Sequence, residues 1–417
     1  MKKILVIAEC INKNKTSQGI GTTSFLNALA HGAFQIDCCY YEHVQHEIYD
    51  TSHINKNINL IKIRNTPLDQ IIQFLRPLRN LSIKYFGVNL LRKRRIARFK
   101  KVLKPILKRK KYDIVFVRTI AGSIASHVAI LELSKTISFN WVANFNDPVP
   151  ITMMPYPYFD GNIKFPKSVI KDENLVKDIV RKCDGITSPS VKLTKLFLSF
   201  AGIKPGEKRV YRFPHIFVEQ NTVTPSFLDT SKFNLVHPGS LLKPRNPEFL
   251  LKAYQKLIKK HPDIKNNIGL TFFGNIHNSH NAIFDSFEFP ELLHIKNTRL
   301  PHDEALGVLQ ESDVLIILEA VSEESPFMPG KLAEFIGLEK MILALSPLKS
   351  ETRRILGEGY PYQSKANDID DIYNHLNKLY NKWSSNQSLK LEDTVLKKYV
   401  SYIHVIEEMN KIINDLK

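Results

Sequence analysis

The sequence predicts an α/β protein built from two domains, each with its own parallel sheet. Short apolar runs typical of buried strands alternate with helical patterns along almost all of the 417 residues. A stretch of turn-forming residues without periodicity, 218–231, interrupts this alternation once. A chain of this length is also too long for one hydrophobic core, so two domains of about 200 residues each are expected.

The expected first domain, 1–217, contains the apolar runs of seven buried strands. These runs are 3–8, 35–41, 58–63, 113–118, 138–143, 184–188 and 208–213. The helical patterns between them predict crossover helices, which parallel strands require. Residues 218–231, "VEQNTVTPSFLDTS", are rich in turn formers and are expected to be a linker.

The alternation resumes in the expected second domain, 232–390. Its strand patterns are 233–237, 268–273, 292–296, 313–318 and 340–345, and its helical patterns are 246–260, 302–310, 329–337 and 367–383. A closing helical pattern follows at 394–416, and we expect the C-terminal segment 391–417 to be able to pack back on the first domain. Ligands are expected beyond the carboxyl ends of the strands.

The net charge of +18 is concentrated in one part of the chain. Residues 64–111 contain 16 Lys and Arg and a single acidic residue, Asp69, so the rest of the chain is nearly neutral. The four cysteines lack the spacing of metal ligands, which favours a reduced, cytoplasmic setting. The first apolar run stops at Glu9 and no window reaches membrane-spanning length, so neither a signal peptide nor a membrane span is expected.

The loop after strand 233–237 has residues that suit a phosphorylated ligand. Gly239 lets a ligand approach the backbone, and Lys243 and Arg245 on the same loop suit a diphosphate. A solvated basic loop without a ligand is the alternative interpretation.

A second candidate site begins at Pro329, which suits the first turn of a short helix. The N–H groups of such a helix terminus can bind an anion, and Lys331 adds a cation there. Glu334 lies one turn further and can accept hydrogen bonds from two vicinal hydroxyls. The pattern therefore fits a ligand with a phosphate at one end and hydroxyls at the other.

Three segments, taken in order, resemble the nucleotide-sugar half of GT-B glycosyltransferases, closest to the retaining group called family 4. They are "HPGSLLKPRNPEFLL", "LPHDEALGVLQESDVLIIL" and "PGKLAEFIGLEKMILAL", and the resemblance covers about residues 235–345. "DGITSPSVKLTKLF" (184–197) is similar to the strand and helix that close the other half. The resemblance implies two Rossmann-like domains facing each other across a cleft, and a UDP- or GDP-type sugar as co-substrate.

The resemblance also implies roles for several of these residues. Glu334 matches the second glutamate of the family's paired motif, which binds the ribose, and Arg245 matches a basic residue on the donor phosphates. The alternative for Glu334 is a helix-face carboxylate paired with Lys331. The family's cation after the glycine is Ser240 here, so Lys331 or Lys243 is expected to substitute.

The first glutamate of the paired motif is missing, because its position is occupied by Pro326. Glu323 and Glu324 lie close by in the sequence and are the candidates for the same sugar hydroxyls. No metal or other cofactor is expected, since basic side chains and a helix dipole can stabilise the departing diphosphate. The pair Asp368 and Asp370 resembles a metal motif but fits a helix cap and a solvated face better.

In the first domain, "SQGIGTTSFLNALA" (17–30) lacks the third glycine of a dinucleotide fingerprint, which argues against a nicotinamide site. GT-B enzymes have a glycine loop here that lines the cleft, which makes Gly19, Gly21 and Thr22 donor-site candidates. An ordinary helix N-terminus is the alternative. In "WVANFNDPVP", Asp147 follows a strand and is expected to orient the acceptor hydroxyl, with a simple Asx turn as the alternative.

The segment 89–111 predicts a basic, partly amphipathic helix that Pro105 should kink or break. Such helices lie on anionic bilayers, which suggests a peripheral position on the inner face of the cell membrane. A helix packed on the sheet with a solvated basic face is the alternative, and nucleic-acid binding is disfavoured because no stacking aromatic residues interleave with the cations. The side chains expected to face the membrane are Arg92, Lys93, Arg94, Arg95, Phe99, Lys100 and Lys101.

Together these observations predict a glycosyltransferase that moves a sugar from a nucleotide-diphosphate donor to a glycan or lipid-linked acceptor, with retention of configuration. The residues expected to act in catalysis are Asp147, Arg245 and Lys331. Two alternatives stay open. One is a nucleotide-sugar 2-epimerase of the same fold, and the other is a non-enzymatic basic protein that docks on membrane or RNA.

Overall fold

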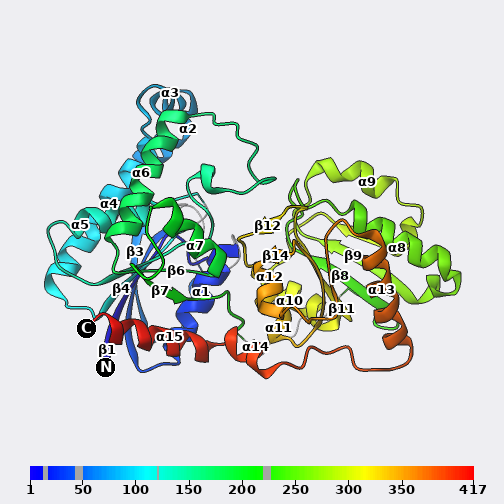
Figure 1. Cartoon of the computed structure of the whole chain (residues 1–417). Coiled ribbons are helices and arrows are strands. Elements are labelled where there is room, and N and C mark those ends of the chain that lie inside the picture. Colours follow the sequence, from blue (N-terminus) through cyan, green and yellow to red (C-terminus); the bar gives the residue numbers. More distant parts are fainter. Residues whose placement is uncertain (13–16, 43–49, 120–121, 219–226) are drawn as a thin grey trace. The chain divides into compact units, whose positions relative to one another are not determined.

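The computed structural model describes residues 1–12, 17–42, 50–119, 122–218 and 227–417 (Figure 1). The chain forms two compact units, and each has a parallel sheet. The first unit comprises Met1–Ile216 and Tyr402–Lys417, and the second comprises Phe217–Ser401. Of the expected linker 218–231, residues 219–226 lie outside the described part of the chain.

The first unit has a seven-stranded sheet in the order β3-β2-β1-β4-β5-β6-β7. Every pairing is parallel, and β1 pairs with β2 and β4 in registers such as Ile4↔Ile36 and Ile4↔Ile114. The strands are β1 (Lys2–Ala8), β2 (Phe34–Glu42), β3 (Ile58–Arg64), β4 (Ile114–Arg118), β5 (Trp141–Asn144), β6 (Gly185–Ser188) and β7 (Arg209–Arg212).

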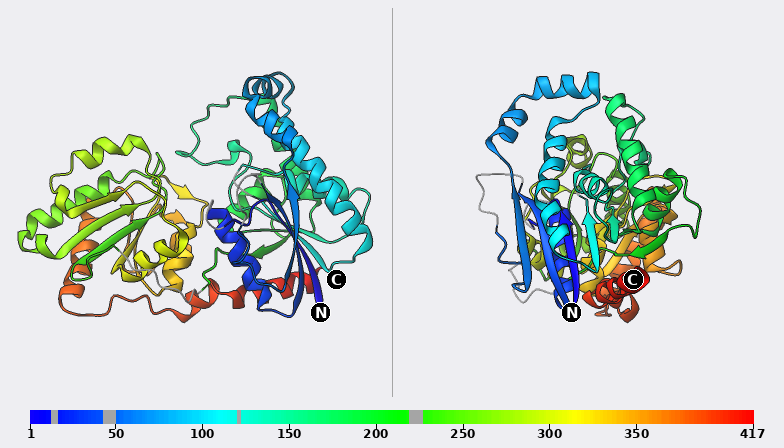
Figure 2. Two further views of the ribbon diagram at one scale, coloured as in Figure 1. Left: turned by 180° about the vertical axis from the view of Figure 1, so that it is seen from behind. Right: turned by 90° about the vertical axis from the view of Figure 1, so that its left-hand side faces the viewer.

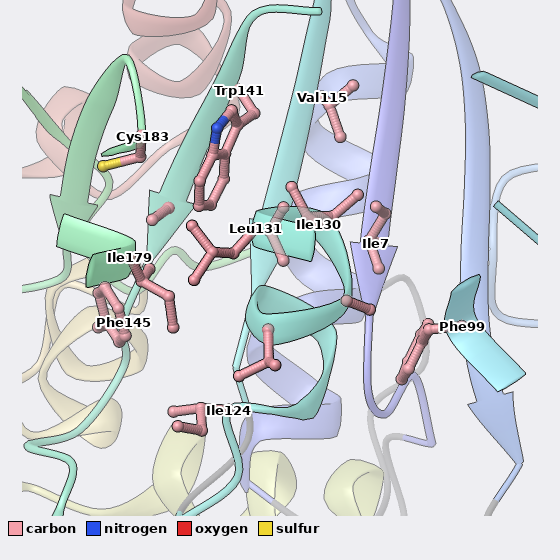
Figure 3. Packing of buried hydrophobic residues seen from close by; sticks show 14 of the residues in the cluster. Ile7, Phe99, Val115, Ile124, Ile130, Leu131, Trp141, Phe145, Ile179 and Cys183 are labelled. Atoms are coloured by element: carbon pink, nitrogen blue, oxygen red, sulfur yellow. The ribbon is translucent and has the colours of Figure 1, made fainter. Parts of the chain in front are cut away.

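Two sets of helices cover the two faces of this sheet. Alternating strand residues such as Ile4 and Leu5 point to opposite faces and belong to two separate hydrophobic clusters. One cluster includes α1 (Ser17–Ala30) and α15 (Tyr402–Asp415). The other includes α4 (Leu90–Arg109), α5 (Ala125–Leu133), α6 (Pro166–Lys182) and α7 (Val191–Phe200), and Figure 3 shows its packing around Trp141 and Leu131.

The C-terminal helix α15 belongs to the first unit although it is last in the sequence. Lys2 donates to the side chains of Asn410 and Asn414, at 3.0 Å and 3.2 Å. The Glu408 carboxylate accepts the backbone N–H of Arg212 at 2.8 Å. The expected closing helix 394–416 is therefore divided at Val400–Ser401 into α14 (Thr394–Tyr399) of the second unit and α15 of the first.

The second unit has a six-stranded sheet in the order β10-β9-β8-β11-β13-β15, the doubly wound order of dinucleotide-binding domains. Its strands are β8 (Phe233–Pro238), β9 (Ile268–Phe273), β10 (Leu293–Lys296), β11 (Val314–Leu318), β13 (Met341–Leu345) and β15 (Gln363–Ser364). The cluster on one face includes α8 (Glu248–Lys260), α9 (Asn281–Asp285) and α13 (Ile369–Ser384). The cluster on the other includes α10 (His302–Glu311), α11 (Gly330–Gly337) and α12 (Glu351–Leu356).

Local capping explains several helix boundaries. Asn89 begins α4 and accepts the N–H of Arg92, and Ser190 begins α7 in the same way. Asp368 caps α13 by accepting the N–H of Asp371, while Asp370 forms an ion pair with Lys256. The two aspartates thus form the helix cap and solvated face that the sequence favoured over a metal site.

Helix α4 continues through Pro105, although the sequence predicted a kink or break there. Phe99, Leu103 and Leu107 are all buried against the first unit's core, on both sides of the proline. Burial of these side chains outweighs the single backbone hydrogen bond that proline removes. No helix within the described ranges has an apolar stretch long enough to span a bilayer.

Candidate functional site

Each sheet has one point at which its strand order reverses, and ligands of open α/β sheets bind beyond the strand ends at such points. In the second unit this point lies between β8 and β11, and in the first unit between β1 and β4. The residues that follow these four strands are therefore the natural candidates for ligand contacts.

Gly239 follows β8 and has a φ of +101°, which only glycine adopts without strain. Its N–H donates to the Phe273 carbonyl at 2.7 Å. A Cβ placed on Gly274 would lie 2.3 Å from the Gly239 carbonyl oxygen, so the loops after β8 and β9 are in direct contact. Ser240 and Lys243 are exposed on the first of these loops.

The guanidinium of Arg245 is held over the same loop. The Arg245 N–H closes a turn on the Leu242 carbonyl at 2.8 Å, and its Nη1 lies 3.5 Å from the Ser240 carbonyl oxygen. The loop thus places a hydroxyl donor and cationic donors at the carboxyl end of β8, and such donors suit a diphosphate.

Helix α11 carries the second pair of candidates. Its Lys331 ammonium donates to the Glu334 carboxylate at 2.6 Å, and only 7% of Glu334 is exposed. The Lys331–Glu334 ion pair, which was the alternative interpretation of Glu334, is therefore present. It occupies one oxygen of the Glu334 carboxylate. Gly337 ends the helix against Phe217, whose ring would lie 2.1 Å from an added Cβ.

Glu323 and Glu324, the substitutes considered for the missing glutamate, are both exposed. Glu324 lies in β12 (Glu324–Ser325), which pairs with β14 (Lys349–Ser350) through Glu324↔Lys349. This small ribbon was not apparent from the sequence, because two-residue strands have no detectable periodicity.

A further carboxylate, Glu319, follows β11 at the switch point of the second unit. It is fully buried, and its Oε1 accepts the Thr352 hydroxyl at 2.7 Å. Burial raises the pKa of Glu319 above its usual range, against the opposing effects of hydrogen bonds from Ser325 and Thr352 and of the Arg245 and Arg353 charges. Glu319 could not be recognised from the sequence, since a glutamate that ends an apolar run has no signal of burial.

Glu319→Gln is expected to be more stable than wild type at neutral pH and no more stable near pH 4. The native carboxyl holds its proton at a pH where the unfolded one has lost it, so wild-type stability falls as pH rises from about 4.5 toward the raised pKa. A native carboxyl that is a tenfold weaker acid than the unfolded one lowers the free energy of unfolding of the ionised protein by about 1.4 kcal/mol. The measurement is the melting temperature (Tm) of both proteins from pH 4 to 8.

The control for this series is Glu323→Gln, which changes an exposed carboxyl on the following loop. Its Tm should follow that of wild type throughout. A Tm difference between Glu319→Gln and wild type that stays constant with pH would contradict the prediction.

In the first unit, the glycine candidates lie in the first two turns of α1. A Cβ on Gly19 would meet the Asn12 carbonyl oxygen at 2.0 Å, so close packing of the preceding loop explains this glycine. Thr22 is buried, and Gly21 lies under the His215 ring, 3.6 Å from an added Cβ. Asp147 accepts the Gln18 amide at 2.5 Å, which ties the end of β5 to the start of α1.

Arg118 is the most unusual residue at the carboxyl ends of the first unit's strands. It ends β4 at the switch point, only 5% of it is exposed, and its guanidinium lies 4.5 Å over the Phe25 ring of α1. Its Nε has no hydrogen-bond partner among the described residues, and no carboxylate of the described chain forms an ion pair with it. Burial lowers its pKa to about 9, and the Arg118 charge adds to the burial that lowers the pKa of neighbouring His215 to about 4.

The segment expected to face a membrane is largely committed to contacts within the first unit. Arg92 pairs with Asp172, Arg94 with Asp69, Arg95 with Glu9, and Lys100 with Glu132, at 2.6, 2.5, 3.3 and 2.5 Å. Phe99 is fully buried in the core, so the prediction that it faces a membrane was wrong. It occupies the stripe of α4 that packs on the sheet, while Lys93 and Lys101 remain exposed.

No protein-family model and no curated protein matches the sequence. Solved structures do match over the whole chain. A trehalose-6-phosphate synthase, OtsA, has a TM-score of 0.66 at 10% identity and covers 100% of this chain and 99% of its own. The lipopolysaccharide outer core galactosyltransferase WaaB has a TM-score of 0.59 at 12% identity, with 99% of both chains covered. These neighbours are GT-B glycosyltransferases.

The chain has the GT-B fold. An α,α-trehalose-phosphate synthase (UDP-forming) from Burkholderia xenovorans, in complex with glucose-6-phosphate, matches over 100% of both chains, with a TM-score of 0.63 at 9% identity. At such low identities the likeness concerns the fold alone, and the resemblance to family 4 stays a prediction. The two Rossmann-like sheets expected of a GT-B protein are both present.

Proposed function

We propose that this GT-B protein is a glycosyltransferase whose second unit binds a nucleotide-diphosphate sugar. The observation that carries the proposal is the donor set beyond β8, where Gly239 and Arg245 suit a diphosphate, together with the buried Glu334 of α11. In this proposal Arg245 and the N-terminus of α11 hold the phosphates, and Glu334 accepts hydrogen bonds from the ribose hydroxyls.

The proposed acceptor is a glycan or lipid-linked sugar bound by the first unit. Arg118 supports an acceptor with an anionic group, because a buried guanidinium that no carboxylate of the described residues neutralises is unfavourable until an anion binds it. Asp147 would orient the attacking hydroxyl, within a segment that its contact with Gln18 fixes.

We also propose that configuration is retained and that no metal takes part. Attack on the face that the diphosphate leaves lets a phosphate oxygen accept the hydroxyl proton, so the protein must mainly stabilise charge. Arg245, Lys331 and the helix dipole of α11 would supply that stabilisation.

The test of the donor site is thermal stability with UDP, GDP, ADP and CMP at millimolar concentration. One of these nucleotides is expected to raise the Tm of wild type, since a ligand at 100 times its dissociation constant adds roughly 2.7 kcal/mol of stability. Glu334→Ala is expected to lose most of this increase, because the ribose hydroxyls lose their acceptor.

The matched control is Glu288→Ala, which removes another lysine–glutamate pair, with Lys259, on an exposed surface of the second unit. It should keep the full increase in Tm. No increase with any nucleotide, or an equal increase in Glu334→Ala, would overturn the proposed donor site. An epimerised sugar released without an acceptor would instead identify a 2-epimerase.

A further inference from the structure

Two short helices of the first unit expose an unusual amount of apolar surface. Helices α2 (Pro67–Phe74) and α3 (Arg76–Phe86) are joined by Leu75, and we call residues 67–86 the α2–α3 hairpin. Nine of the 22 large apolar side chains exposed in the described part of the chain lie between positions 68 and 90. They are Leu68, Ile71, Phe74, Leu75, Leu78, Leu81, Tyr85, Phe86 and Leu90.

These side chains recur at helical spacing and lie at one end of α4. Leu78, Leu81 and Tyr85 follow at three and four residues, which places them on one face of α3. Phe74 and Phe86, at the ends of the two helices, are 84% and 70% exposed. Both views in Figure 2 show α2 and α3 beyond the end of α4, away from the sheet of their own unit.

The opposite side of the hairpin is firmly attached to the first unit. Asp69 accepts from the N–H of Thr66 at 2.8 Å and pairs with Arg94 and Arg98 of α4. On α6, Lys167 and Lys171 donate to the carbonyls of residues 85 and 86, at 3.1 Å and 2.7 Å. The apolar face is therefore held outward by a fixed set of contacts.

The charges around this face have one sign. Arg76 and Lys84 are exposed on α3, and the buried Asp69 is the sole acidic residue between positions 64 and 111. An apolar face bordered by cations, with no exposed carboxylate between positions 64 and 111, is complementary to the surface of an anionic bilayer. A second copy of the chain fits less well, since a symmetric contact would bring these cations together.

We propose that the α2–α3 hairpin is a membrane-docking surface that inserts its apolar side chains into the interface of an anionic bilayer. In this proposal the basic helix α4 supports the hairpin and is not itself the membrane-binding surface. The reason is that most of the α4 cations near the hairpin are paired with carboxylates. Lys108 and Arg109, which form no ion pair with the described residues, lie at the other end of α4, roughly 25 Å away along the helix. This inference does not depend on glycosyl transfer.

The test is binding of the full chain to phosphatidylglycerol/phosphatidylcholine vesicles and to vesicles of phosphatidylcholine alone, measured by co-sedimentation. Wild type is expected to bind the anionic vesicles, with an affinity that falls as salt rises. Phe74→Ser combined with Phe86→Ser should weaken binding at least tenfold, and Arg76→Gln combined with Lys84→Gln should weaken it and flatten the salt dependence. Phe74→Trp should show a blue-shifted emission on the same vesicles.

Two control variants make the test specific. Val395→Ser changes a side chain of α14 that is 76% exposed, and Lys108→Gln combined with Arg109→Gln removes two cations from the far end of α4. Both should bind vesicles like wild type. The hairpin variants should keep the wild-type Tm and its increase with nucleotide, because the changed side chains are exposed and do not belong to the donor site.

Three results would overturn the inference. The first is that the α4 variant loses vesicle binding as fully as the hairpin variants, and the second is that the wild type does not bind anionic vesicles. The third is that the hairpin substitutions convert a dimer to a monomer. The last result, seen by light scattering, would mean that a second copy covers the apolar face.

Discussion

Arg118→Met is expected to lower sugar transfer about 30- to 4,000-fold without lowering the Tm. In wild type the guanidinium is buried at the end of β4, and no carboxylate within the described ranges pairs with it, so its removal relieves an unfavourable charge. An acceptor phosphate or carboxylate would then lose its charged partner, which typically costs 2–5 kcal/mol or about 30- to 4,000-fold.

Two measurements check this result. The first is incorporation of labelled sugar into a membrane extract, from the donor named by the nucleotide screen. The second is the Tm as a function of inorganic phosphate at constant ionic strength, which should rise more for wild type than for Arg118→Met.

Arg95→Met is the control for an arginine at the same edge of the first sheet. Arg95 pairs with the buried Glu9 at 3.3 Å, so its loss leaves a carboxylate without its cation and should lower the Tm. If Arg118→Met also lowers the Tm, or if it responds to phosphate like wild type, Arg118 is a structural residue and the proposed anion site is wrong.

Arg245→Ala is expected to weaken binding of the nucleoside diphosphate about 10- to 150-fold while leaving binding of the free nucleoside nearly unchanged. Hydrogen bonds from a charged donor to a phosphate contribute about 1.5–3 kcal/mol each, and the base and ribose do not contact this arginine in the proposed site. Isothermal titration with the diphosphate and with the nucleoside measures both constants.

Glu334→Ala should behave differently in the same titrations. It should weaken the nucleoside and the diphosphate by similar factors, because both contain the ribose. Lys259→Ala, on the exposed side of α8, should change neither constant. Equal losses of nucleoside and diphosphate in Arg245→Ala would place that arginine away from the phosphates.

The sequence predicted the long elements well, because periodicity is a local property. All twelve expected strand patterns correspond to strands, and the helical patterns at 302–310 and 329–337 correspond to α10 and α11. The sequence did not predict that the closing helical pattern is broken into two helices, since the break at Val400–Ser401 depends on which unit each half packs against. The two-residue strands β12, β14 and β15 exist only through pairing with distant segments.

The candidate site was predictable to the extent that residue types and spacing define it. Gly239, Arg245, Lys331 and Glu334 were recognisable from glycine, charge and helix-start signals. Roles that depend on the residues packed around a side chain could not be recognised in this way. Gly19 is explained by contact with Asn12, and the importance of Glu319 and Arg118 follows from burial.

The sequence by itself determined the α/β architecture, the two units and the concentration of positive charge between positions 64 and 111. Only the tertiary structure decided how that charge is used. In the tertiary structure, most of the cations near the start of α4 are paired with carboxylates, and the apolar side chains of the α2–α3 hairpin are exposed. The physical reason is that charge and hydrophobicity belong to single residues, whereas pairing and burial depend on residues brought together from distant parts of the chain.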